Sequence, residues 1–128
     1  MKILLITVTI MSLLVGCEMA RKQLGANLLG EQFIAANEQV NHCNLSGLNY
    51  FSHAANDNSN KIVQVSSLLA IGGHYATVGD MVNVDRIVDR LVAIDPDRDF
   101  DEERTLLIKD GKILAQVRVG NGFTATCR

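Results

Sequence analysis

The first seventeen residues constrain most strongly what this chain can fold into, because they divide it into a leader and a mature domain. Lys2 gives the stretch a positive start, and residues 3–15 follow without a charged side chain. A positive flank, an apolar run and small residues after it are typical of a secretory signal peptide. The run is shorter than the roughly 18 apolar residues of a membrane-spanning helix. We therefore predict that residues 1–16 are removed and that the remainder forms one small exported domain.

The end of the leader, Leu14-Val15-Gly16-Cys17, resembles the lipobox of bacterial lipoproteins. The resemblance implies that Cys17 becomes the mature N-terminus and carries acyl chains that anchor the protein in a membrane. Several acyl chains hold a protein on a bilayer far more firmly than one. In enteric members of the family, a residue other than Asp after the cysteine points to the outer membrane, and Glu18 stands here. The alternative is an ordinary signal peptide that leaves Cys17 as a free thiol.

Assigning Cys17 to lipid leaves two cysteines, Cys43 and Cys127. Paired cysteines of exported bacterial proteins usually form a disulfide. We therefore predict the bond Cys43–Cys127, which would contribute about 4.5 kcal/mol at best in the chain-entropy model. The alternative, a redox or catalytic thiol, lacks a Cys-x-x-Cys spacing to support it.

The composition argues against several classes of function. The formal net charge is -2 and no basic run is present, so the electrostatic signature of nucleic-acid binding is missing. Tryptophan is absent and other aromatic residues are few, which disfavours a stacking platform for bases or sugars. We predict a protein that binds no nucleic acid and needs no cofactor.

Acidic residues alternate in one segment in the manner of a calcium-binding loop: Asp95, Asp97, Asp99, Asp101 and Glu103. The segment lacks the glycine and the final glutamate that such a loop requires. His42, His53 and His74 do not have the spacing of a zinc protease. The sequence therefore predicts neither a metal site nor an enzyme.

The mature chain predicts a short lipidated tether over residues 17–23 and a folded domain over residues 24–128. Apolar residues recur at helical spacing in residues 24–40 and 81–94, and Asp80 is a good N-cap for the second helix. Residues 61–71 fit a helix or a strand, and we favour a helix that begins after Ser59 and ends at Gly72. Asparagine and serine are frequent in residues 41–60, which predicts a long loop with a short strand at residues 48–51.

The C-terminal region carries the strongest β signal. Asp110-Gly111 favours a two-residue hairpin turn between residues 105–109 and 112–119, with Ile108 paired to Ile113. Residues 123–127 then form a third strand after the turn at 120–122. The predicted fold is α+β, with two or three helices packed on an antiparallel three-stranded meander and closed by one disulfide.

These features favour a lipid-anchored, non-enzymatic accessory factor that binds another protein of the bacterial envelope, in the outer membrane and facing the periplasm. One candidate contact surface is the asparagine-rich loop with Tyr50, Phe51 and His53. Another is the charged face of the 81–94 helix, formed by Asp85, Arg86, Asp89 and Arg90. The alternative is a periplasmic binding module for peptidoglycan or a small envelope ligand.

Overall fold

The structure, a computed structural model, describes residues 27–128, and all regular secondary structure in this part of the chain is helical. The helices are α3 (Glu31–Asn41), α4 (Gly47–Ala54), α5 (Lys61–Thr77), α6 (Met81–Ile94) and α7 (Phe100–Gly120). The prediction of an α+β fold with a three-stranded meander is therefore wrong. The predicted signal peptide, Cys17 and the predicted tether lie outside the described residues.

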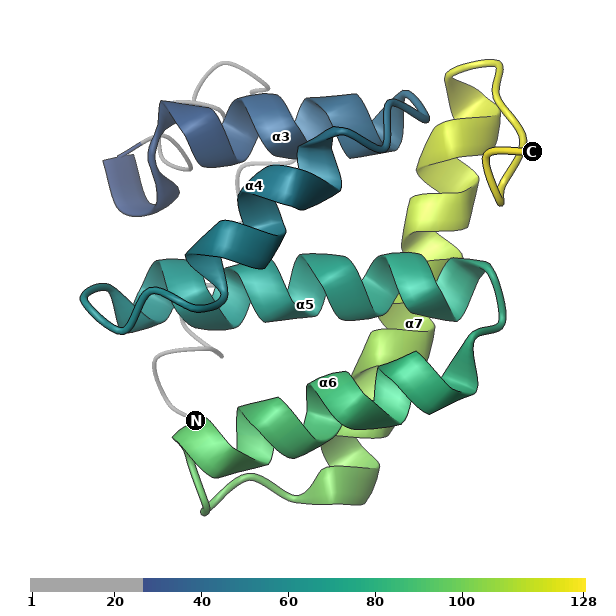
Figure 1. Ribbon diagram of the computed structural model, residues 1–128. Coiled ribbons are helices and arrows are strands. Elements are labelled where there is room, and N and C mark those ends of the chain that lie inside the picture. Colours follow the sequence, from purple (N-terminus) through teal and green to yellow (C-terminus); the bar gives the residue numbers. More distant parts are fainter. Residues whose placement is uncertain (1–26) are drawn as a thin grey trace.

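Helix α5 lies at the centre of the arrangement. Figure 1 shows α3 and α4 on one side of α5 and α6 on the other, with α7 crossing behind it. The core consists of buried apolar side chains from all five helices and from the turn that follows α4. They are Phe33, Ala36, Val40, Phe51, Ala55, Leu68, Ile71, Val84, Ile87, Val88, Leu91 and Leu107. Full burial of one large apolar side chain contributes about 1.5–3 kcal/mol, so this cluster holds the helices together.

Helix α6 spans the residues predicted for it. The side chain of Asp80 accepts a hydrogen bond from the backbone N–H of Asn83 (3.2 Å) and caps the start of the helix. The apolar stripe that predicted this helix is buried: Val84, Ile87, Val88 and Leu91. The helix ends before Asp95, as proline at the next position requires.

The helix predicted over residues 24–40 is confirmed only in part, because Gly30, with a φ of 89°, interrupts it. Residues 27–29 are helical before this break, and α3 begins after it. The long loop predicted over residues 41–60, with its short strand, is wrong in its middle, where α4 forms. Phe51 of α4 is fully buried and packs edge to face on Phe33, with ring centroids 5.0 Å apart. A helix as short as α4 is not stable in isolation, so this packing decides its structure.

Helix α5 confirms the helical interpretation of residues 61–71 but continues to Thr77. Asn60, rather than Ser59, caps it by accepting a hydrogen bond from the backbone N–H of Val63 (3.2 Å). Gly72 lies inside the helix, where an added Cβ would come within 2.8 Å of the Leu107 side chain. The predicted helix end at Gly72 is wrong because this glycine makes room for α7.

Helix α7 replaces the predicted hairpin. The side chain of Asp99 caps its start by accepting a hydrogen bond from the backbone N–H of Glu102 (3.0 Å). The helix then runs through Asp110 and Gly111 without a turn. An added Cβ on Gly111 would lie 2.7 Å from the Cβ of Ala76, so the glycine permits close approach of α5 and α7. The residue pair that predicted a turn instead serves the packing of two helices.

Three helices end with the same backbone motif. The chain after α3, α5 and α7 passes through a residue with positive φ: Cys43 (57°), Gly79 (73°) and Gly122 (86°). The backbone N–H of the next residue donates to a carbonyl in the last turn of the helix, as in a Schellman motif. These bonds are Asn44 to Gln39 (2.8 Å), Asp80 to Tyr75 (2.9 Å) and Phe123 to Arg118 (3.0 Å). The third strand predicted over residues 123–127 is wrong, because the chain turns back here onto the end of α3.

Within residues 27–128, no helix combines the length and the apolar character needed to cross a membrane.

Candidate functional site

The predicted disulfide is confirmed. Cys43 and Cys127 are bonded across 84 positions of sequence, with Cα atoms 5.2 Å apart. The bond ties the turn after α3 to the segment that follows α7. Cys43 occupies the left-handed position of its Schellman motif, where glycine is more common. The rings of His42 and Phe123 stack edge to face beside it, with centroids 5.9 Å apart.

Arg118, the last basic residue of α7, is buried next to this disulfide with no exposed surface. Its Nε donates to the carbonyl oxygen of Val40 (3.1 Å), and its Nη1 donates to Thr77 Oγ1 (3.1 Å) and to the carbonyl oxygen of Ala125 (3.0 Å). Its Nη2 lies 3.0 Å from His74 Nδ1. We call Arg118, these four partners and the disulfide the C-terminal cluster.

The charge of Arg118 is compensated by backbone and side-chain oxygens, and it forms no ion pair within the described part of the chain. Val40 and Thr77 belong to the last turns of α3 and α5, where helix dipoles place partial negative charge. Burial lowers the pKa of His74, and the charge of Arg118 lowers it further. The imidazole is therefore neutral at pH 7, and its Nδ1 accepts the hydrogen bond from Arg118.

The charged face of α6, predicted as a contact surface, is partly used inside the molecule. Asp85 forms an ion pair with Arg104 of α7 (2.8 Å). Arg90 Nη2 donates to the carbonyl oxygen of Ala55 (3.2 Å) and to Asn56 Oδ1 (2.8 Å). Half of the predicted docking face thus fastens α6 to its neighbours.

The asparagine-rich segment, also predicted as a contact surface, is held in a similar way. The buried side chain of Gln64 donates to the carbonyl oxygen of Ala55 (3.1 Å) and to Asn58 Oδ1 (2.9 Å). Phe51 is in the core and Tyr50 is half-buried against Phe33, whereas His53 is exposed. The structure therefore does not bring Tyr50, Phe51 and His53 together as an exposed patch.

The acidic segment at residues 95–103 serves the start of α7. Asp99 caps the helix, and Glu103 pairs with Arg98 (2.9 Å), which also lies 3.8 Å from Asp95. No group of three or more metal-ligating side chains occurs among residues 27–128.

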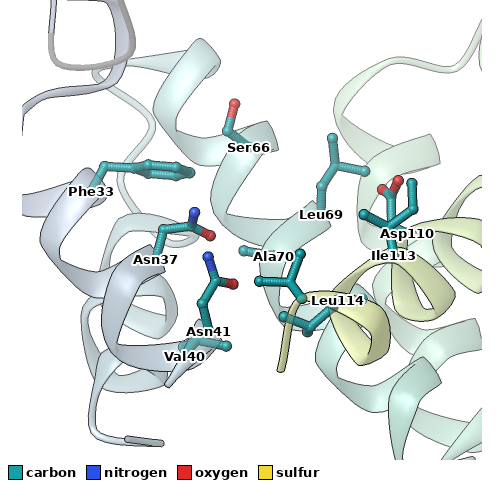
Figure 2. Close-up of a pocket in the computed structure, with 12 residues that line it drawn as sticks. Phe33, Asn37, Val40, Asn41, Ser66, Leu69, Ala70, Asp110, Ile113 and Leu114 are labelled. Atoms are coloured by element: carbon teal, nitrogen blue, oxygen red, sulfur yellow. The ribbon is translucent and has the colours of Figure 1, made fainter. Parts of the chain in front are cut away.

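A groove of about 350 Å³ lies between α3, α5 and α7. Its floor is α5, which contributes four residues at helical spacing, all partly or wholly covered. These are Ser66, Leu69, Ala70 and Gly73. Figure 2 shows this floor between the two walls.

The wall on the α3 side contains one aromatic ring and two side-chain amides. Its residues again follow helical spacing: Phe33, Asn37, Val40 and Asn41. Figure 2 shows the ring of Phe33 and the amides of Asn37 and Asn41 directed toward the groove. Neither amide side chain forms a hydrogen bond within the described residues, so both remain available to a ligand.

The wall on the α7 side combines apolar side chains with one carboxylate: Asp110, Ile113, Leu114 and Val117. Ile113 is 50% exposed and Val117 is 38% exposed. Leu106, 41% exposed, continues the same face of α7 beyond the groove. Isolated exposed apolar residues are ordinary, but a stripe that borders a groove marks a surface suited to binding.

Asp110 is the acidic group of the groove. Burial raises the pKa of its carboxyl, an effect that nearby Lys109 opposes and the charge of Glu103 reinforces. Its carboxylate has no hydrogen-bond or ion-pair partner between residues 27 and 128. Asp110 itself is exposed at the edge of the groove, and an unpaired carboxylate there favours a basic group beside it.

Comparison of the chain with protein-family models, with curated proteins and with solved structures finds no match in any of the three. The groove therefore has to be interpreted from its own residues. Sequence reasoning missed it because its walls come from three separate segments. It also missed Arg118, although Phe100, Leu107, Leu114 and Arg118 follow the spacing of one helical face.

Proposed function

We propose that the protein is a lipid-anchored lipoprotein of the bacterial cell envelope whose folded domain acts as a non-enzymatic accessory factor by binding an envelope protein. The lipobox-like sequence Leu14-Val15-Gly16-Cys17 carries the proposed anchor. The Cys43–Cys127 disulfide supports export, since such bonds persist in oxidising compartments that include the bacterial periplasm. Glu18 after the cysteine supports the outer membrane, with the domain facing the periplasm.

The groove supports a binding role for the folded domain. It presents apolar side chains of α7 to solvent beside an unpaired carboxylate. Covering apolar surface contributes about 25 cal/mol per Å², and pairing the carboxylate adds specificity. This combination is the single structural observation that favours an interaction protein.

The anchor is tested by metabolic labelling with an alkyne-bearing fatty acid in bacteria that express the protein. The wild-type protein should incorporate the label and fractionate with the outer membrane, whereas Cys17→Ser should do neither. The double variant Cys43→Ser/Cys127→Ser is the matched control and should label as the wild type does. Equal labelling of the wild type and Cys17→Ser would contradict the lipoprotein assignment.

The accessory role is tested by crosslinking the anchored protein in cells and identifying what it captures by mass spectrometry. One dominant envelope protein, captured by the wild type and lost from Cys17→Ser, is the expected result. Recovery of no protein partner would contradict the role.

The second candidate function is a binding module for peptidoglycan or a small envelope ligand. Asn37, Asn41 and Ser66 favour it, since they place hydrogen-bonding groups along a groove whose volume of about 350 Å³ lies within the range of small-molecule sites. Retention of the purified protein on isolated cell wall, abolished by Asn37→Ala/Asn41→Ala, would favour this candidate over the first.

A further inference from the structure

We propose that the groove between α3, α5 and α7 binds an amphipathic helical segment of a partner protein, and that this segment places a lysine or arginine against Asp110. The proposal deepens the accessory role and rests on it, because the occupant is part of a protein. The expected segment has apolar residues one helical turn apart and one basic residue beside them.

The dimensions of the groove fit about two turns of helix. The α7 wall runs from Asp110 to Val117, which corresponds to about 10 Å at 1.5 Å per residue. The α3 wall, from Phe33 to Asn41, has a similar length of about 12 Å. A helix laid on the α5 floor between these walls would cover the groove, as amphipathic helices do when they enter grooves of helical proteins.

The end of the groove is closed by the C-terminal cluster. The bond from Arg118 to the carbonyl oxygen of Val40 joins the two walls, and Asn121 Nδ2 donates to the carbonyl oxygen of Asn41 (3.4 Å). The disulfide holds the same ends together. The walls are therefore fixed in place before an occupant arrives, which reduces the ordering cost of binding.

Charge complementarity selects the occupant. Asp110 lies among apolar groups and has no partner in the described residues, while nearby Glu103 is already paired with Arg98 (2.9 Å). An entering lysine or arginine would form a charge-assisted hydrogen bond with the exposed carboxylate of Asp110. The exposed side chains of Ile113 and Val117 would meet the apolar residues of the same helix.

The test is a selection of displayed 15-residue peptides on the purified mature protein carrying Cys17→Ser, with its disulfide intact. We expect the enriched peptides to share apolar residues at spacings of three, four and seven and one basic residue in a constant position. The best synthetic peptide should gain helical circular dichroism on binding. It should also bind Asp110→Asn about two- to fivefold more weakly, as loss of an exposed ion pair predicts. Its binding to Ile113→Glu should be lost.

Two variants of α6 serve as matched controls, because they introduce the same residues at exposed positions away from the groove. Asp89→Asn and Val82→Glu should bind the peptide as the wild type does. Absence of any enriched helical peptide, or equal affinity for the wild type and Asp110→Asn, would overturn the proposal. The proposal would also be overturned if the wild type formed a dimer in sedimentation, or bound to isolated cell wall, and Ile113→Glu abolished that behaviour. Another occupant would then fill the groove.

An envelope protein captured in cells equally by the wild type and by Ile113→Glu would leave the accessory role standing and overturn the groove assignment. Absence of lipid labelling would overturn the anchor, whereas the peptide measurements on the purified protein would stand.

Discussion

The C-terminal cluster and the groove lie side by side on α7, and they treat a charged side chain in opposite ways. Arg118 is completely buried, and four groups from α3, α5 and the C-terminal segment satisfy it. Asp110, two turns earlier, is exposed at the edge of the groove beside apolar side chains and has no such partner among residues 27–128. A charge that the fold satisfies internally stabilises the fold, whereas one left unpaired beside apolar surface is suited to an external partner. Substitutions at the two regions should therefore have different consequences.

The largest expected effect comes from the disulfide of the C-terminal cluster. Replacing both cysteines in Cys43→Ala/Cys127→Ala should lower the free energy of unfolding by about 2–4 kcal/mol, because the bond closes a long loop. Urea denaturation monitored by circular dichroism measures the change, and reduced wild-type protein should match the double variant. A loss below 1 kcal/mol would mean that Arg118 alone holds the walls together.

Removal of the buried cation should have the next largest effect. Arg118→Met should lower the free energy of unfolding by about 3 kcal/mol, because buried oxygens of Val40, Thr77 and Ala125 lose their donor. Urea denaturation again provides the measurement. Arg86→Met on the exposed face of α6 is the control and should change stability by no more than about 0.5 kcal/mol. Equal losses of unfolding free energy in Arg118→Met and Arg86→Met would contradict the distinction between a buried structural arginine and an exposed one.

The crossing of α5 and α7 supports both regions and is tested at Gly111. Gly111→Ala should destabilise the protein by about 1–3 kcal/mol, because the new Cβ would lie 2.7 Å from the Cβ of Ala76 and force the helices apart. Alanine is otherwise the better helix former by about 1 kcal/mol. Gly120→Ala, with no atom within 4 Å of the added Cβ, should be neutral or stabilising. Thermal unfolding should show a lower midpoint for Gly111→Ala and an unchanged or higher midpoint for Gly120→Ala.

The protonation of His74 should make the C-terminal cluster sensitive to acid. Its folded-state pKa is lowered from 6.5, so the unfolded chain takes up a proton first as the pH falls. This contribution to stability is complete above about pH 6.5 and decreases as the pH falls below that value. The decrease ends once the pH is below the folded-state pKa. The total loss is about 1.4 kcal/mol for each unit by which the folded-state pKa lies below 6.5. Urea denaturation at several pH values should show the decrease in the wild type and not in His74→Gln. An exposed control, His53→Gln, should keep the wild-type profile.

The smallest effect on stability is expected at Asp110. Burial raises the pKa of this carboxyl, so the stability of the wild type decreases as the pH rises from 3.8 through the folded-state pKa. Asp110→Asn avoids that cost and should change the free energy of unfolding at pH 7 by no more than about 0.5 kcal/mol, in the stabilising direction. A clear loss of stability in urea denaturation would show that Asp110 has a structural role and would remove the contrast with Arg118.

Helices α6 and α7 show how far local sequence predicts this fold. In α6 the N-cap Asp80, the paired apolar positions and Asp95-Pro96 agree with one another, and the helix was predicted with its observed bounds. In α7 the sequence also contains helical signals, with Asp99 before an acidic first turn and Leu107 and Leu114 seven residues apart. Asp110-Gly111 and the flanking apolar residues supported a hairpin, and that interpretation was wrong.

The glycines explain this error. Gly79 and Gly122 end helices because the chain there needs a positive φ. Gly72 and Gly111 lie inside helices because a side chain at either position would collide with the crossing helix. A glycine that ends a helix and a glycine that makes room for a crossing helix look alike in the sequence, because only the neighbouring helix distinguishes them.

The sequence by itself determined helix α6, the preference for a helix at residues 61–71 and the pairing of Cys43 with Cys127. These features depend on local spacing, on capping residues or on the two cysteines that remain once Cys17 is predicted to carry lipid. Tertiary structure alone decided α4, the helical state of α7, the burial of Arg118 and the groove with Asp110. Each of these depends on contacts between segments far apart in the chain, and the free energy of those contacts exceeds the weak local preferences for a loop, a turn or an exposed charge.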